Sequence, residues 1–307
     1  MVMPMSRWLQ LAVSIALSAA VLGACSSDPG WPPEQTNFEL IPVLISAEVV
    51  VGNNRVLFNV LDRQNRSVAA ADRPLALRFF HLGTNRTQPA LEAQATFTPT
   101  SEGRPGLYRA MVNLDRAGDW GVEATTTESS GAKRTGRFVF PVYESGTTPA
   151  IGAAALASDT PTAATPAEIA AISTDNVPDP DFYRKSVADA LAAHEPFALV
   201  FATPAFCTSL TCGPTLDVIK SAATPFKGRM DFIHVEPYEL EMADGQLRPV
   251  LNAQNLPISV AATMEWGLPT EPYVFVVDAN GNVSAKFEGI AAADELAAAF
   301  GAVARPS

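Results

Sequence analysis

Two cysteines, Cys207 and Cys212, are the residues of this chain whose type and spacing best suit chemistry, with four residues between them. They follow an apolar run at 197–201 and precede a segment at 215–223 that has the composition of a helix. A thiol between a strand and a helix can lose its proton readily, because the positive end of the helix dipole stabilises the thiolate. Such a pair can exchange disulfides with other thiols, bind a soft metal ion, or form a permanent structural disulfide.

The third cysteine, Cys25, indicates where the protein works. Arg7 precedes an apolar run of about 15 residues, and small residues separate that run from Cys25. This order is typical of a signal peptide. The run is short for a transmembrane helix, which needs roughly 20 apolar residues.

The residues before Cys25, Leu22-Gly-Ala, resemble the lipobox of bacterial lipoproteins. That resemblance implies a signal peptide at 1–24, a lipid such as palmitate on Cys25, and a mature protein anchored in the cell envelope, outside the cytoplasm. In a cell with two membranes it implies the outer membrane, facing the periplasm, because Ser26 rather than Asp follows the cysteine. The alternative is an ordinary signal peptide with a chance cysteine.

Composition narrows the classes of function. The formal net charge of −11 argues against a nucleic-acid partner, since such partners require basic patches. Lipidation of Cys25 would leave Cys207 and Cys212 as an even pair in an oxidising compartment. The mature chain, with about 280 residues, is long enough for two domains.

The first half of the mature chain has the pattern of an all-β domain. A polar, Pro-rich tether at 25–37 leads into short alternating strands at 38–144, separated by turn residues. This pattern predicts an antiparallel sandwich. The stretches Gly106-Leu-Tyr108 and Ala117-Gly-Asp-Trp120 also resemble a pattern of bacterial extracytoplasmic Ig-like domains, which bears on fold rather than function.

The second half alternates predicted helices and strands. An Ala/Thr/Pro-rich linker is expected at 145–180, followed by helices at 181–194, 214–223, 248–251, 260–265 and 291–303 among apolar strands. The order of elements at 181–307 resembles the thioredoxin fold. The predicted fold class is therefore a two-domain protein, with an N-terminal all-β Ig-like sandwich and a C-terminal α/β thioredoxin-like domain.

The thioredoxin resemblance implies a role for each site residue. Cys207 would be the nucleophile, Cys212 the resolving thiol, and Pro272 a cis-proline that shapes the edge where a partner docks. From its place before that proline, Glu271 is a candidate acid or base beside the cysteines, the alternative being a solvated loop carboxylate. The sequence departs from the family in its four-residue spacer and in Phe201, which stands where the family has a buried acid. Because Cys212 precedes Gly-Pro, as in the family motif, the opposite assignment of the two thiols also stays open.

The predicted function is thiol–disulfide exchange by a membrane-anchored extracytoplasmic protein. Its partners would be thiols or disulfides of other extracytoplasmic proteins, with membrane contact through the lipid anchor, no nucleic acid and no cofactor. One alternative is a non-catalytic binding lipoprotein whose disulfide is structural. Another is a copper chaperone, which rests on a resemblance to copper-delivering thioredoxin-like proteins that use two nearby cysteines and a distant histidine. Cys207 and Cys212 would bind the ion; His234 could ligate a metal, although its position differs from that of the family's histidine.

Overall fold

The computed structural model describes residues 31, 40–100, 106–128, 130–207 and 211–306. Cys25, the signal peptide at 1–24 and most of the tether at 25–37 lie outside these residues. The chain from Phe38 to Ser307 forms one compact unit. Among the described residues, no helix is long and apolar enough to cross a membrane.

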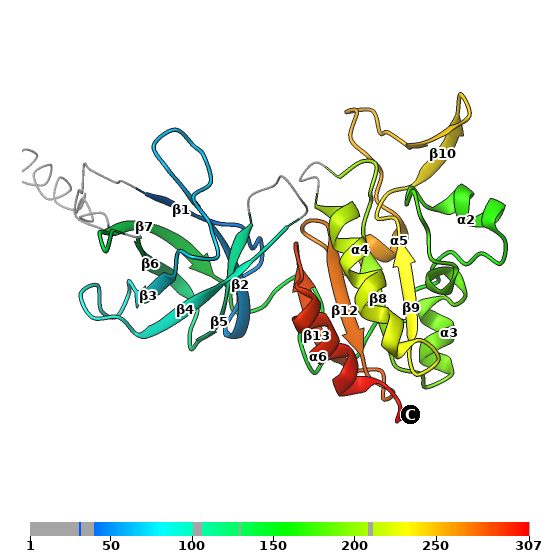
Figure 1. Ribbon diagram of the computed structural model, residues 1–307. Helices are drawn as coiled ribbons and strands as arrows, with labels where there is room; N and C mark the ends of the chain where they lie inside the picture. The colour runs from blue at the N-terminus through cyan, green and yellow to red at the C-terminus, as the bar shows by residue number, and fades with distance from the viewer. Residues whose placement is uncertain (1–30, 32–39, 101–105, 129, 208–210, 307) are drawn as a thin grey trace, which may run out of the picture. The chain divides into compact units, whose positions relative to one another are not determined.

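The first region is one antiparallel sheet of seven strands, in the order β1-β2-β5-β4-β3-β6-β7 (Figure 1). Its strands are β1 (Ile41–Leu44), β2 (Gly52–Leu61), β3 (Leu75–His81), β4 (Leu91–Thr98), β5 (Leu107–Leu114), β6 (Gly118–Thr127) and β7 (Lys133–Val142).

Alternation of side chains gives this sheet a buried inner face. On β5, Tyr108, Ala110 and Val112 are buried whereas Met111 points to solvent, as the two-residue period of a strand requires. Trp120 is fully buried in the same core, and its indole N–H donates to the carbonyl of Arg116 at 3.0 Å.

The Ig-like sandwich predicted from the sequence is wrong, because the strands form a single sheet that is nearly closed. The first half of β4 pairs with β3, and its last three residues pair with β5. β4 therefore connects β3 and β5 within one sheet, whereas a sandwich would have two separate sheets. Beyond the two edge strands, Val50 forms a bridge with Tyr143, which brings the two ends of the sheet together. Local alternation sets the strands but does not set their partners.

The second region contains a four-stranded sheet in the order β13-β12-β8-β9. β8 and β9 are parallel, whereas β12 is antiparallel to both β8 and β13. Its strands are β8 (Phe197–Phe201), β9 (Asp231–Val235), β12 (Tyr273–Val277) and β13 (Val283–Glu288); a separate hairpin consists of β10 (Leu240–Ala243) and β11 (Gln246–Pro249).

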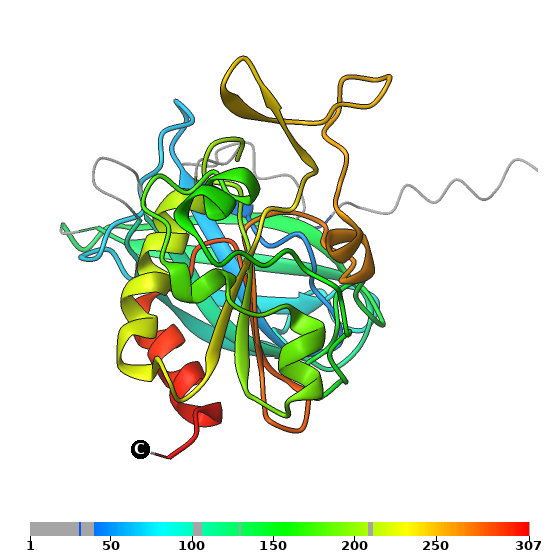
Figure 2. The same ribbon diagram turned by 90° about the vertical axis from the view of Figure 1, so that its right-hand side faces the viewer.

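Short helices cover both faces of this sheet (Figure 2). Leu216 and Phe300 lie in one apolar cluster with Val200, and Val187 and Ala262 lie in another with Leu199. Successive residues of β8 therefore face opposite layers. The helices are α2 (Pro166–Ile172), η1 (Pro180–Tyr183), α3 (Val187–Ala192), α4 (Cys212–Ala223), η2 (Thr224–Phe226), α5 (Ala261–Glu265) and α6 (Ala293–Val303).

The predicted α/β thioredoxin-like domain is also wrong. The protein is mostly β, about 19% helical, and no such domain is evident in its described residues. The single helix expected at 181–194 is divided into η1 and α3, and residues 248–251 belong to β11 and an adjoining bridge instead of a helix. The stretch at 145–180 carries α2, whose Ile169 is buried in the core.

Candidate thiol site

The two cysteines lie at the ends of one loop that β8 and α4 position. β8 is buried along its whole length and lies between β9 and β12, which fixes the start of the loop. The backbone N–H groups of Phe206 and Cys207 both donate to the carbonyl of Thr203, at 3.2 and 3.0 Å. This turn places Cys207 beside the sheet, and residues 208–210 between it and α4 lie outside the described residues.

Both cysteine residues are nearly inaccessible to solvent. Cys207 is 4% exposed and Cys212 is fully buried, and both belong to the apolar cluster under α4. Cys212 is the first residue of a twelve-residue helix whose first turn contains no acidic side chain, so negative charge there is favoured by the helix dipole.

A buried polar network ties the loop to the strand β9. Thr174 donates its hydroxyl and its backbone N–H to Oε1 of Glu236, each at 2.6 Å. The same hydroxyl accepts the N–H of Ala205 at 3.2 Å. Glu236 is 6% exposed, and its other oxygen, like Oγ1 of Thr203, has no hydrogen-bond partner among the described residues. A buried polar atom without a partner costs about 1–3 kcal/mol.

His234 supports the start of the loop. One of its ring nitrogens, Nε2, lies 2.9 Å from the carbonyl oxygen of Ala202, and Nδ1 lies 2.9 Å from the hydroxyl of Tyr183. A carbonyl can only accept, so Nε2 carries the proton and Nδ1 of the neutral ring accepts from the Tyr183 hydroxyl. Burial lowers the pKa of His234 and raises the pKa of Tyr183. Both ring nitrogens are thus in use.

The predicted cis-proline is present, and the glutamate before it is hydrogen-bonded. The peptide bond between Glu271 and Pro272 is cis. Tyr273 pairs with Phe201, so Pro272 and the loop that leads to Cys207 leave the sheet at the same end. The carboxylate of Glu271 accepts the hydroxyl of Tyr238 at 3.0 Å, and burial together with this carboxylate raises the pKa of Tyr238 to about 12.

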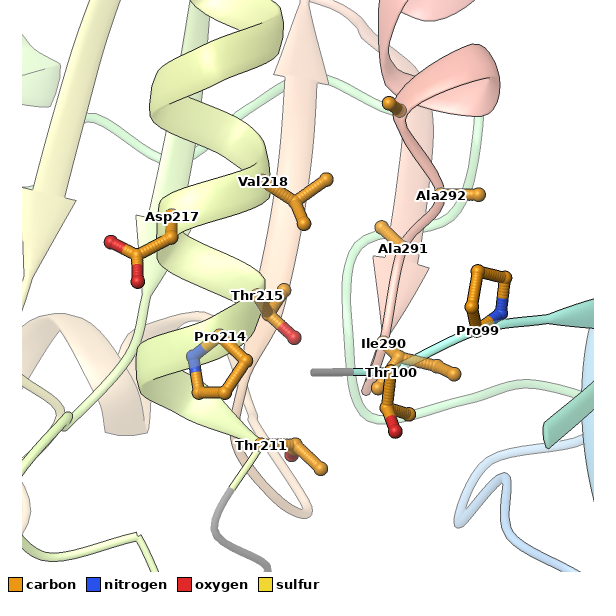
Figure 3. A pocket seen from close by; sticks show the side chains of 11 residues that line it. Pro99, Thr100, Thr211, Pro214, Thr215, Asp217, Val218, Ile290, Ala291 and Ala292 are labelled. Atoms are coloured by element: carbon orange, nitrogen blue, oxygen red, sulfur yellow. The ribbon is translucent and has the colours of Figure 1, made fainter. Parts of the chain in front are cut away.

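A groove runs along the first turns of α4 and has a volume of about 430 Å³. In Figure 3, Thr215 and Val218 project from α4 toward the segment that carries Ala291 and Ala292. We call this feature the α4 groove. Its wall consists of Pro99, Thr100, Thr211, Pro214, Thr215, Asp217, Val218 and residues 290–293.

The structure brings together Cys207, Cys212 and Pro272 at one end of the four-stranded sheet, whereas Glu271 is engaged by Tyr238. The sequence analysis missed Thr174 and Glu236. The signal for Glu236 was its place directly after the apolar strand at 231–235; nothing pointed to Thr174. The described residues contain no cluster of three or more His, Cys, Asp or Glu side chains that could hold a metal ion.

No protein-family model matches the chain, and no curated protein matches it. Among solved structures, it is similar to the PmoD soluble domain from Methylocystis sp. ATCC 49242 (Rockwell), with 19% identity over 34% of this chain and 90% of that one and a TM-score of 0.22. It is also similar to MtrC from Shewanella baltica OS185, with 13% identity over 48% of this chain and 28% of that one and a TM-score of 0.24.

A third solved structure that resembles the chain is a putative glycoside hydrolase from Bacteroides vulgatus ATCC 8482. The identity is 12% over 70% of this chain and 35% of that one, with a TM-score of 0.23. The chain thus spans about a third or less of MtrC and of the hydrolase. At such TM-scores these likenesses support no conclusion on fold or activity.

Proposed function

We propose that this protein exchanges disulfides with other extracytoplasmic proteins through Cys207 and Cys212, while a lipid on Cys25 anchors it to the membrane. One observation carries the proposal: two cysteines flank a single loop, and one of them is the first residue of a twelve-residue helix. The Thr174–Glu236 hydrogen bonds support it, since they hold the loop backbone in place.

The exchange proceeds by two thiolate attacks. The thiolate of Cys207 attacks the substrate disulfide, forms a mixed disulfide with one substrate sulfur and releases the other, which takes up a proton. The thiolate of Cys212 then attacks the Cys207 sulfur. This step forms the Cys207–Cys212 disulfide and releases the second substrate thiolate, which also takes up a proton. The substrate is reduced, the protein dithiol is oxidised, and the reverse sequence oxidises a substrate dithiol.

Exposure and position support this order of attack. Cys207 is the more accessible of the two at 4%, and Cys212 lies at the helix start with no exposed surface. Of the two cysteines, Cys207 is therefore the one that a substrate disulfide would reach first, whereas Cys212 needs only to reach Cys207. The helix dipole favours a thiolate at Cys212, which is the form that attacks in the second step.

A structural disulfide is the second candidate function, and the burial of both cysteines favours it. The reduction potential of the pair separates the two. A value in the range of roughly −120 to −270 mV fits exchange, whereas a value below about −300 mV indicates a bridge that is never reopened. In addition, Cys212→Ser should accumulate a mixed disulfide on Cys207 with a substrate protein, because the second attack is removed; absence of such a species contradicts exchange through Cys207.

A further inference from the structure

The α4 groove is a largely apolar recess at the start of α4, the helix whose first residue is Cys212. Val218 and Pro214 on α4 and Ile290 and Ala291 after β13 supply apolar walls. Thr211 also lines the groove and directly precedes Cys212 along the chain. A ligand in the groove therefore lies beside the start of α4.

The charge at the groove disfavours small anionic ligands. Asp217 is the one charged side chain in its wall as described, and it is 71% exposed at the rim. Lys220 pairs with Asp217 at 2.9 Å and also with Asp175 at 2.7 Å, so two carboxylates share one ammonium group. The chain as a whole carries a formal charge of −11. An anionic thiol such as glutathione therefore gains little binding free energy in the groove.

We propose that the α4 groove binds apolar side chains of a substrate polypeptide next to the cysteine that exchanges with Cys207. This inference rests on the proposed function and adds the substrate class: polypeptide thiols or disulfides with apolar neighbours, in preference to small anionic disulfides. Burial of one leucine-sized side chain in such a recess changes an equilibrium about tenfold or more. The selectivity between the two substrate classes is therefore about tenfold or more.

Two disulfides serve as probes of this preference. One is the disulfide-linked dimer of a short neutral peptide with two leucines next to its cysteine, and the other is oxidised glutathione. The reduced, full-length protein is mixed with each probe, and the rate of mixed-disulfide and Cys207–Cys212 disulfide formation is followed by mass spectrometry. We expect the peptide to react at least about tenfold faster than oxidised glutathione.

Variants on α4 test the groove itself. Val218→Glu places a carboxylate in the groove and should slow the peptide about tenfold without slowing oxidised glutathione as much. The matched control is Ser221→Glu, which adds the same charge at an exposed position of the same helix. A second variant, Ala293→Leu, fills the groove at an exposed position without adding charge and should also slow the peptide selectively.

The outcomes separate this inference from the proposed function. The groove is supported as the binding site if Val218→Glu and Ala293→Leu remove the preference for the peptide while Ser221→Glu keeps it. Equal rates for both probes, or a preference unchanged in both groove variants, overturn the groove while exchange through Cys207 stands. Failure of the parent protein to react with either probe overturns the proposed function and the groove with it.

Discussion

Two buried carboxylates, one in each region, are treated in opposite ways by the fold. In the seven-stranded sheet, Glu123 has one oxygen bound by Arg78 at 2.8 Å and the other by Arg137 at 2.6 Å. Beside the cysteine loop, Glu236 has one oxygen bound twice by Thr174 and the other without a partner among the described residues. Both residues are similarly buried, at 7% and 6% exposed.

The difference between the two carboxylates separates a stabilising role from the ability to accept a further hydrogen bond. A carboxylate whose oxygens are both bound by arginines has its desolvation cost offset and has little to offer a further group. A carboxylate oxygen without a partner costs stability and keeps the capacity to accept another hydrogen bond. The sheet also contains buried hydroxyls without a partner among the described residues, at Thr98 and Thr126, but these are neutral. The uncompensated acidic oxygen thus lies next to the thiol loop, where the proposed chemistry takes place.

The largest effect is expected from Cys207→Ser, which should abolish exchange because it removes the thiolate that attacks the substrate disulfide, while the remaining Cys212 is fully buried. The rate of reduction of a protein disulfide should fall to the uncatalysed rate. Cys25→Ser is the matched control, since it makes the same change at the predicted lipid site. It should release the protein from the membrane fraction and leave exchange in solution unaltered. Residual exchange in Cys207→Ser would show that Cys212 attacks first.

Glu123→Gln tests the stability half of the comparison. The neutral amide cannot pair with both Arg78 and Arg137, so the free energy of unfolding should fall by about 1–3 kcal/mol, as measured by urea denaturation. Exchange should be unchanged, because Glu123 lies on β6. The control is Glu92→Gln, which removes the other partner of Arg78. That carboxylate is 66% exposed, and such a pair contributes under about 1 kcal/mol. An equal loss of unfolding free energy in both variants would contradict the stabilising role assigned to Glu123.

Thr174→Val tests the other carboxylate of the comparison, Glu236, and its network beside the cysteine loop. The change removes one of the two donors to Glu236, the Thr174 hydroxyl, together with the acceptor for Ala205, so stability should fall by about 1–2 kcal/mol. The reduction potential of the thiol pair should also shift, because the loop loses its attachment. Thr125→Val is the control on the sheet, where the Thr125 hydroxyl bonds to Thr135 at 2.9 Å. It should lower stability by a similar or smaller amount and leave the potential unchanged. A potential unchanged in Thr174→Val would leave the network without a role in exchange.

The sequence predicted short strands at 38–144, where the first region has its seven strands, yet it failed on how these strands pair. The existence of a strand such as β3 (Leu75–His81) follows from the local alternation of apolar and polar side chains. The pairing of β4 with both β3 and β5 depends on residues far apart in the chain. A local signal was also overlooked at Asp244-Gly245, where both residues have positive φ and form the turn of the β10–β11 hairpin. A helix was expected at the residues that follow.

Only those features of the candidate site that lie within one short segment of the chain could be predicted from the sequence. Cys207, Cys212 and the cis bond before Pro272 could be read from short motifs. The contact between Thr174 and Glu236 joins residues 62 positions apart, so no local pattern contains it. The hydrogen bond from Tyr238 to the carboxylate of Glu271 joins residues 33 positions apart, so it too lies outside any local pattern.

The smallest effect is expected from pH, through His234. Burial lowers its pKa in the folded protein, while the unfolded chain keeps a value of about 6.5. The unfolded state therefore binds a proton first as the pH falls below about 6.5, and stability is lost at up to about 1.4 kcal/mol per pH unit until the folded value is reached. Above about 6.5 this contribution is fully present.

Urea denaturation between roughly pH 5 and 7.5 measures the slope of stability against pH that His234 contributes. His234→Gln should remove that slope, although it also lowers stability at every pH, since the amide cannot keep both bonds in the geometry of the ring. His81→Gln is the matched variant in the seven-stranded sheet, where the ring of His81 bonds to Thr84 and to the carbonyl of Ala117. It should keep the slope that His234 causes. If the slope instead disappeared with His81→Gln, the pH response would belong to the sheet, and the contrast between the two regions would not extend to their histidines.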